Sequence, residues 1–193
     1  MKFSRSQSVI LGLVLLSLSV FPWSGRGADL SDLTYTISNN EVTITDCNTS
    51  ASGHLDIPAT IEGHPVTSIG DYAFQYCSSL TSITIPDSVT RIGDSVFIEN
   101  QSMHSITVSS ENPNYSSEDG VLFNKTKTVL IAFPGGKSGE YSIPRGVLTL
   151  EFQAFDAIPF LSKVFLPATC TIFMEIICHM NSMVTLLSIV ASL

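Results

Sequence analysis

A seven-residue stretch near the middle of the chain returns 23 residues later. Residues 68–74 read Ser-Ile-Gly-Asp-Tyr-Ala-Phe, and residues 91–97 read Arg-Ile-Gly-Asp-Ser-Val-Phe. The same offset continues without a gap and matches Ile83 with Ile106. A fixed period of about 20 to 29 residues, with apolar residues at fixed places, is typical of stacked solenoid coils. We therefore expect coils stacked along an axis, not a closed globule.

The repeated unit combines a short strand with a tight turn. Ile83 and Ile85 are two residues apart on the expected strand, so both side chains point to the same, inner side. Gly70 and Gly93 stand where the backbone must turn tightly, which favours a residue without a side chain. Each coil can bury apolar residues only against the coils above and below, so we expect neighbouring coils to stabilise one another.

Residues 1–28 have the composition of an export signal. Lys2 and Arg5 give a basic start, an apolar run covers residues 9–20, and small residues lead to a predicted cleavage site near Ala28. The apolar run is shorter than the roughly 20 residues that span a bilayer. This favours a cleaved signal peptide over the alternative, an uncleaved anchor. We expect the protein to be secreted or displayed at the cell surface.

The charge balance restricts the possible partners. Three of the nine Lys and Arg residues lie in the predicted signal peptide, which leaves 6 basic against 17 acidic residues and a formal charge of −11. Nucleic acids and anionic lipids both require clustered Lys and Arg. We therefore expect no nucleic-acid partner. We also expect no membrane span in the mature chain, because polar residues leave only residues 183–193 of the last segment largely apolar, about half a span.

The four cysteines are predicted to be unpaired structural thiols. Cys77 takes the place that Asn100 holds one period later, and Cys47 stands alone near the N-terminus. Cys170 and Cys178 lie in the irregular last segment. A disulfide framework is the alternative for an exported chain. No Cys-x-x-Cys pair is present, so the sequence does not support a zinc site, and no cofactor is expected.

Two strand–turn–strand patterns accompany the repeats. The first, in residues 29–53, surrounds a turn at residues 38–41 and is expected to cap the open end of the stack. The second lies in residues 109–140, inside the array of residues 54–169, and is expected to form an inserted β-hairpin. The repeat motif is lost in residues 170–193, which are either a degenerate last repeat or a truncated one.

With these motifs, the chain resembles the BspA-like leucine-rich repeat proteins. The resemblance covers residues 55–167 and rests on the runs 66–74, 77–86 and 112–125. It implies a mostly β fold, a short right-handed leucine-rich-repeat solenoid with one parallel sheet, here with an N-terminal β-hairpin cap and an inserted β-hairpin. It also implies export to the cell surface, where some members adhere to host or matrix proteins. The family brings no catalytic residues.

The strand face of the array is the first candidate site. Alternation along the strands points one set of side chains outward, on strands about 4.8 Å apart. Such a face can hydrogen-bond a protein strand or a glycan, and the alternative is a set of plain solvated positions. The candidate residues on this face are Thr81, Thr84, His104, Thr107, Ser142, Lys163 and Phe165.

The insertion is the second candidate, because loops inserted into rigid scaffolds often carry function. Phe123 and Phe133 are expected to act as apolar anchors for a ligand. Lys125 and Lys127 are expected to supply local positive charge. The alternative is a hairpin that packs on the array and only stabilises it.

These patterns favour a non-enzymatic module that binds an extracellular protein or glycan, as in adhesion. No His stands at a motif spacing from a Ser, Cys or carboxylate, which disfavours an enzyme. His54 and His104 could approach each other on the sheet face, but two imidazoles without a carboxylate make a weak metal site. The alternative function is a structural spacer or a fragment of a longer surface repeat protein.

Overall fold

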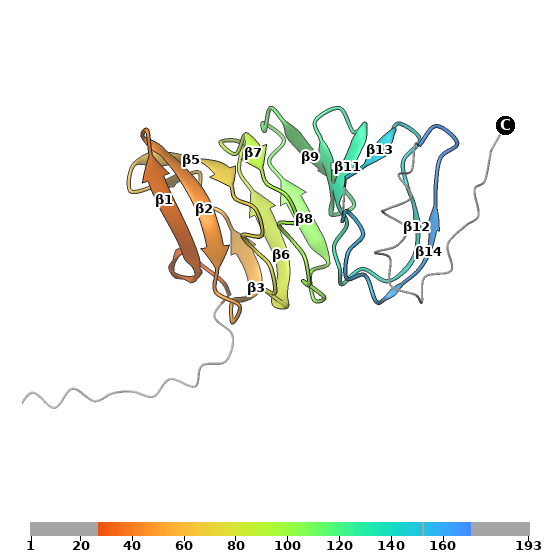
Figure 1. The fold of residues 1–193 in the computed structure, drawn as a ribbon, viewed down its shortest axis with the longest axis horizontal. Helices are drawn as coiled ribbons and strands as arrows, with labels where there is room; N and C mark the ends of the chain where they lie inside the picture. Colours follow the sequence, from red (N-terminus) through yellow and green to blue (C-terminus); the bar gives the residue numbers. More distant parts are fainter. Residues whose placement is uncertain (1–26, 152, 171–193) are drawn as a thin grey trace, which may run out of the picture.

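The structure of the chain, a computed structural model, describes residues 27–151 and 153–170. These residues form a β-solenoid, in which the strands follow one another from β1 at one end to β14 at the other (Figure 1). Within the described residues there is no α-helix. Most of the predicted signal peptide and of the predicted last segment lies outside this range.

The strands are short and rich in Thr, Val and Ile, because β-branched side chains pack well on a pleated surface. The 3-10 turn η1 (Leu30–Asp32) precedes them. In chain order the strands are β1 (Leu33–Ser38), β2 (Glu41–Cys47), β3 (Ser52–Asp56), β4 (Thr60–Ile61), β5 (His64–Ile69), β6 (Ser79–Ile85), β7 (Arg91–Ile92), β8 (Ser105–Val108), β9 (Tyr115–Glu118), β10 (Val121–Asn124), β11 (Val129–Ala132), β12 (Gly139–Ser142), β13 (Thr149–Leu150) and β14 (Leu161–Phe165).

Each coil adds one strand to a first wall of the solenoid and one strand to a second wall. On the first wall β3, β6 and β8 pair in parallel, and further along β12 pairs with β14. On the second wall β2, β5 and β7 pair in parallel, and β11 pairs with β13. We number the coils by their residues: 52–78 is the first, 79–101 the second, 102–138 the third and 139–160 the fourth.

An antiparallel hairpin of β1 and β2 precedes the first coil. Its turn contains Asn39 and Asn40 with φ angles of 53° and 64°, a left-handed geometry that Asn tolerates well in tight hairpin turns. Strand β2 also pairs in parallel with β5, so the hairpin extends the second wall of the array. Its role as an end cap stays a prediction.

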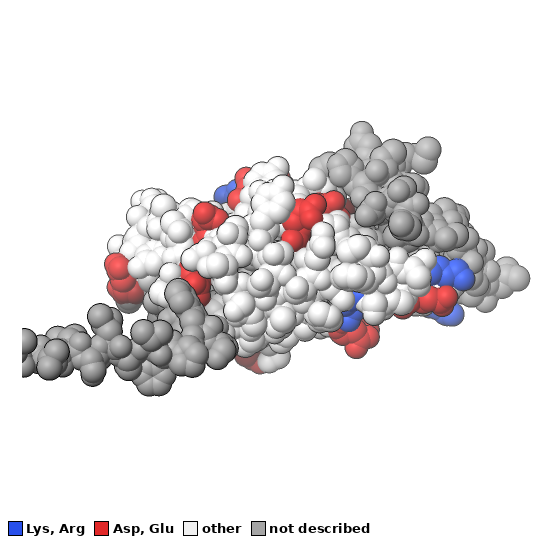
Figure 2. Space-filling view, turned by 90° about the horizontal axis from the view of Figure 1, so that it is seen from below, with Lys and Arg blue, Asp and Glu red and all other residues white. Residues whose placement is uncertain are grey.

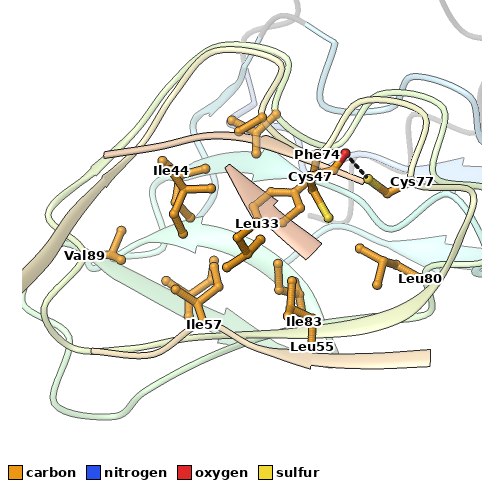
Figure 3. Close-up of a cluster of buried hydrophobic side chains, with 14 of the residues drawn as sticks. Leu33, Ile44, Cys47, Leu55, Ile57, Phe74, Cys77, Leu80, Ile83 and Val89 are labelled. Atoms are coloured by element: carbon orange, nitrogen blue, oxygen red, sulfur yellow. Dashed lines mark hydrogen bonds between the residues drawn. The ribbon is translucent and has the colours of Figure 1, made fainter. Parts of the chain in front are cut away.

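Apolar side chains from both walls meet inside the coils (Figure 3). Leu55 on β3 and Ile83 on β6 are fully buried and lie on neighbouring rungs of the first wall. Ile44 and Val89, also fully buried, belong to the same cluster. Ile83 and Ile106, which are 23 residues apart and fully buried, are paired in register on the first wall, so the period places equivalent apolar residues one above the other, as the repeat predicts.

Aromatic rings continue this stacking along the array. The ring centroids of Phe74 and Phe97 are 5.8 Å apart, and those of Phe133 and Phe155 are 5.2 Å apart. Phe133 thus takes the place of the repeat phenylalanine in the third coil. The insertion lengthens that coil without removing its stacking residue.

Buried polar groups bond the backbone of one coil to the next. Asn100, which is 1% exposed, donates from Nδ2 to the carbonyl of Phe74 at 2.9 Å. One coil earlier, Cys77 Sγ lies 3.6 Å from the carbonyl oxygen of Cys47 (Figure 3). The two residues therefore play equivalent roles, and Cys47, Cys77 and Cys170 are free thiols among the described residues.

The buried apolar residues form two clusters that meet at β10. Leu122 belongs to the cluster of the first coils, whereas its neighbours Val121 and Phe123 belong to the cluster of the later coils. Successive side chains of a strand point to opposite faces. Strand β10 is therefore buried on both faces and separates the two clusters.

Two expectations need correction. The strands do not form one parallel sheet: the described residues contain four sheets, and the insertion separates β8 from β12 on the first wall. The insertion is also larger than a hairpin, because β9, β10 and β11 are joined in antiparallel order and β11 pairs with β13. The inserted strands are thus part of the array and do not protrude from it.

The expectation that Phe123 and Phe133 act as exposed anchors is wrong. Phe123 is fully buried and Phe133 is 4% exposed, because both pack into the cluster of the later coils. Their apolar area is already removed from water and is not available to a ligand.

We expect Phe123→Ala to destabilise the protein by about 3–5 kcal/mol, because the substitution leaves a cavity in a packed core. Phe160→Ala is a matched control, since Phe160 is 54% exposed and a surface substitution costs about 0.5 kcal/mol or less. Urea unfolding followed by circular dichroism measures both. Equal losses for the two variants would contradict the burial of Phe123.

Asn112 holds the start of the insertion, and its loss should cost about 3 kcal/mol because buried groups would be left unbonded. Its side chain is fully buried, donates to the carbonyls of Pro86 and Val89, and accepts from the backbone N–H groups of Asn114 and Tyr115. We expect Asn112→Ala to lower the urea midpoint far more than Asn114→Ala, whose side chain is exposed. A smaller effect for Asn112→Ala would refute this role.

Candidate functional site

Exposed polar side chains cover the β3-β6-β8 face. On β6, Leu80, Ile83 and Ile85 point into the core, whereas Thr81 is exposed and Thr84 is half-buried on the outer side. This pattern arises because successive side chains of a strand point to opposite sides, so the apolar side packs in the core and the polar side faces water.

Four of the predicted residues lie together on this face. The backbone N–H of His104 donates to the carbonyl of Thr81 at 2.8 Å, which joins the second and third coils. Thr84 is paired in register with Thr107 on β8. His104 and Thr107 are exposed, so the group offers hydroxyl and imidazole groups to solvent. We call Thr81, Thr84, His104 and Thr107 the hydroxyl face.

The structure contains a hydrogen-bonded cluster at the edge of the hydroxyl face that was not predicted from the sequence. His54 Nδ1 lies 2.7 Å from Ser82 Oγ, and His54 Nε2 lies 2.9 Å from Asp56 Oδ1 and 3.3 Å from Thr84 Oγ1. Hydrogen bonds from Thr84 and His54 hold the pKa of the Asp56 carboxyl below its usual range. The spacing His54-x-Asp56 was the available signal, because residues two apart on a strand share a face.

The cluster contains the residue types of a serine hydrolase triad, yet its setting differs from one. The side chains of His54 and Asp56 are 48% and 73% exposed. A triad works in a site that excludes water, where the carboxylate is buried and holds the imidazole. In this chain the cluster links neighbouring strands at the surface, and its hydrogen bonds keep four polar side chains in a fixed arrangement.

The structure does not bring His54 and His104 together, because β6 lies between their coils. His104 Nδ1 instead lies 2.6 Å from the carbonyl oxygen of Ser102. Across residues 27–151 and 153–170, no group of three or more His, Cys, Asp or Glu side chains is suited to a metal ion.

The predicted residues of the later strands occupy a different sheet. Ser142 on β12 and Phe165 on β14 are paired in register. Lys163 Nζ lies 5.0 Å from the centroid of the Phe165 ring and 3.8 Å from Glu140 Oε1. The predicted continuous face is therefore divided, and these residues do not adjoin the hydroxyl face.

The lysines of the insertion form their contacts with other residues of the insertion. Lys125 Nζ donates to the carbonyls of Ser110 and Asn112 at 3.0 and 2.6 Å. Lys127 forms an ion pair with Glu118. These contacts tie the turn after β10 to the rest of the insertion, which agrees with a stabilising role more than with a charged binding loop.

The electrostatic character of the surface is mainly acidic. On the face in Figure 2, carboxylates are spread along the molecule, whereas basic side chains lie mostly toward the C-terminal coils. Between residues 27 and 124, Arg91 is the one basic residue of the sequence, His aside. The hydroxyl face therefore belongs to a part of the chain with little positive charge.

Comparison with solved structures gives three bacterial proteins to which this chain is similar. A leucine-rich repeat protein from Eubacterium ventriosum superposes with a TM-score of 0.52 and 21% identity, over 73% of this chain and 59% of its own. The pneumococcal vaccine antigen PcpA gives a TM-score of 0.48 and 16% identity, over 74% and 64%. A leucine-rich cell surface protein from Faecalibacterium prausnitzii gives 0.41 and 18%, over 72% and 70%.

At these identities, the likeness to the Eubacterium protein shows the fold alone. The chain spans 59% of the length of that relative. No curated protein matches the sequence.

The repeats themselves give a more specific match. Residues 56–175 match the BspA type leucine-rich repeat region in six copies, and this range covers more than half of the chain. The match includes the Ile-Gly-Asp turns and the strands of the hydroxyl face. The chain belongs to the BspA-type leucine-rich repeat family.

Proposed function

We propose that this protein is a secreted or surface-displayed binding module, and that its hydroxyl face takes an extracellular protein or glycan. The observation that carries the proposal is the group of Thr81, Thr84, His104 and Thr107 on two adjoining, hydrogen-bonded coils. Their hydroxyl and imidazole groups are both donors and acceptors, so they can bond a peptide backbone or sugar hydroxyls.

The rigidity of the scaffold supports this proposal. Ile83 and Ile106, the core residues behind the hydroxyl face, are fully buried and paired in register. Side chains held by a packed sheet lose little freedom on binding, and a smaller entropy cost leaves more affinity from each hydrogen bond.

Export is part of the same proposal. The basic start, apolar run and small residues of segment 1–28 have the order of a signal peptide. In the described part of the chain, no helix has the length and apolar character needed to cross a membrane. Members of this repeat family are typically secreted or surface proteins, and an extracellular ligand follows from that location.

A structural spacer remains the second candidate. The hydrogen bonds of His54 to Ser82 and Asp56 satisfy polar groups within the chain, as they would on a surface without a ligand. The insertion lysines, which bond to their own segment, agree with the same view. This alternative is distinguished from the first by whether any ligand depends on the hydroxyl face.

The hydroxyl face is tested with the double variant Thr81→Ala/Thr107→Ala. Two lost hydrogen bonds should weaken binding about tenfold. The ligand is first selected from a panel of extracellular matrix proteins and a glycan array, and affinities are then measured by biolayer interferometry. The matched control is Thr34→Ala/Thr36→Ala on β1, where both residues are exposed.

Retained affinity in the Thr81/Thr107 variant, or an equal loss in the control, would overturn the assignment of the site. If no member of either panel binds the wild-type protein, the spacer becomes the supported function. Circular dichroism of all variants separates a loss of binding from a loss of fold.

Export is tested by fusing residues 1–28 to a leaderless alkaline phosphatase, which is active only outside the reducing cytoplasm. We expect activity from the fusion and none after deletion of residues 9–20, because the apolar run is the part that the export machinery recognises. Equal activity with and without the run would contradict a signal peptide.

A further inference from the structure

The third coil has a shorter turn than its neighbours. In the other coils, the stacking phenylalanine stands five positions after a buried or half-buried aliphatic residue of the second wall, whereas in the third coil it stands three positions after it. The strand pairs β5–β7 and β11–β13 place these aliphatic residues in equivalent positions. The intervals are Ile69 to Phe74, Ile92 to Phe97, Leu130 to Phe133 and Leu150 to Phe155.

This shortening leaves a groove between the turns of the second and fourth coils. Its volume is about 550 Å³, within the range of sites that hold small ligands or short peptide segments. One side is formed by residues 93–98, and the other includes Gln153 and Ala154. Ser95 Oγ donates to Gln153 Oε1, so one hydrogen bond joins the two sides.

The floor of the groove is apolar and aromatic. It includes Ile131, Ala132 and Phe133 from the third coil, together with Phe97 from the second coil. Phe133 is held in place by stacking on Phe155 of the fourth coil. Such a floor favours an apolar side chain over a fully hydroxylated ligand, because burying apolar surface is the main favourable term.

The sides of the groove are acidic. Asp94, Glu151 and Asp156 line it, and no Lys or Arg is among its lining residues. Tyr115 also lines the groove. Burial raises the pKa of its hydroxyl, and the nearby positive charge of Arg91 lowers this pKa by a smaller amount. Three carboxylates over an apolar floor are complementary to a cation attached to an apolar group.

We propose that this groove binds a short peptide segment of a partner protein in which Arg or Lys adjoins an aromatic or aliphatic residue. The cation lies against Asp94 and Glu151, and the apolar side chain rests on Ile131 and Ala132, which are only half-buried. The site is independent of the proposed function of the hydroxyl face, because none of the four residues of that face lines the groove.

The probe is a fluorescein-labelled pentapeptide with the sequence leucine-arginine-phenylalanine-lysine-leucine, titrated with the full chain and followed by anisotropy. We expect saturable binding, about tenfold weaker for Asp94→Asn/Glu151→Gln, since each exposed ion pair contributes up to about fivefold in affinity. The matched control Asp87→Asn/Glu111→Gln removes the same charge at exposed positions outside the groove. It should bind like the wild type.

A second variant, Ala132→Phe, fills the floor and keeps all three carboxylates. We expect it to reduce peptide binding at least tenfold while Thr81→Ala/Thr107→Ala leaves it unchanged. Absence of saturable binding, equal weakening by the charge control, or full binding by a correctly folded Ala132→Phe protein would each overturn the proposal. Tighter binding of a cationic glucosamine oligosaccharide than of the peptide would overturn the peptide assignment.

Discussion

The pairing of each coil with the next is the interaction on which the rest of this structure depends. A single coil has too few apolar residues to form a core, and its strands expose backbone N–H and C=O groups on both edges. Pairing satisfies these groups and brings Leu55 and Ile83 onto neighbouring rungs. The surface of the molecule is therefore as regular as its core. The surface pattern is interrupted only where the strand pairing between coils is interrupted.

The repeat made much of this predictable. The spacing that relates Phe74 to Phe97 also placed the buried Asn100 in the position of Cys77. Asn100 contacts a carbonyl of the preceding coil, and Cys77 contacts a carbonyl of the preceding hairpin. Such predictions succeed because a fixed period leaves few choices of register. The third coil was harder, since the sequence predicted a single hairpin in residues 109–140 where the structure has an additional strand, β9.

The candidate site was only partly predictable, for a different reason. Alternation along a strand says which side a residue faces, and it identified Thr81 and Thr107 correctly as outward residues. It does not say which strands remain adjacent after an insertion, so the residues of β12 and β14 were wrongly placed on the same continuous face. Phe123 was misassigned because an apolar strand can be buried on both sides, which local sequence does not reveal.

The position of β10 also affects how the molecule resists unfolding. Leu122 packs with the early coils, whereas Val121 and Phe123 pack with the later ones, so one strand holds two cores together. In a quasi-one-dimensional array, neighbour interfaces carry cooperativity, and a weak interface divides the array into separately opening units. We therefore expect the insertion to set a boundary at which the two halves of the solenoid open, and exchange their amide hydrogens, as separate units that are coupled through β10.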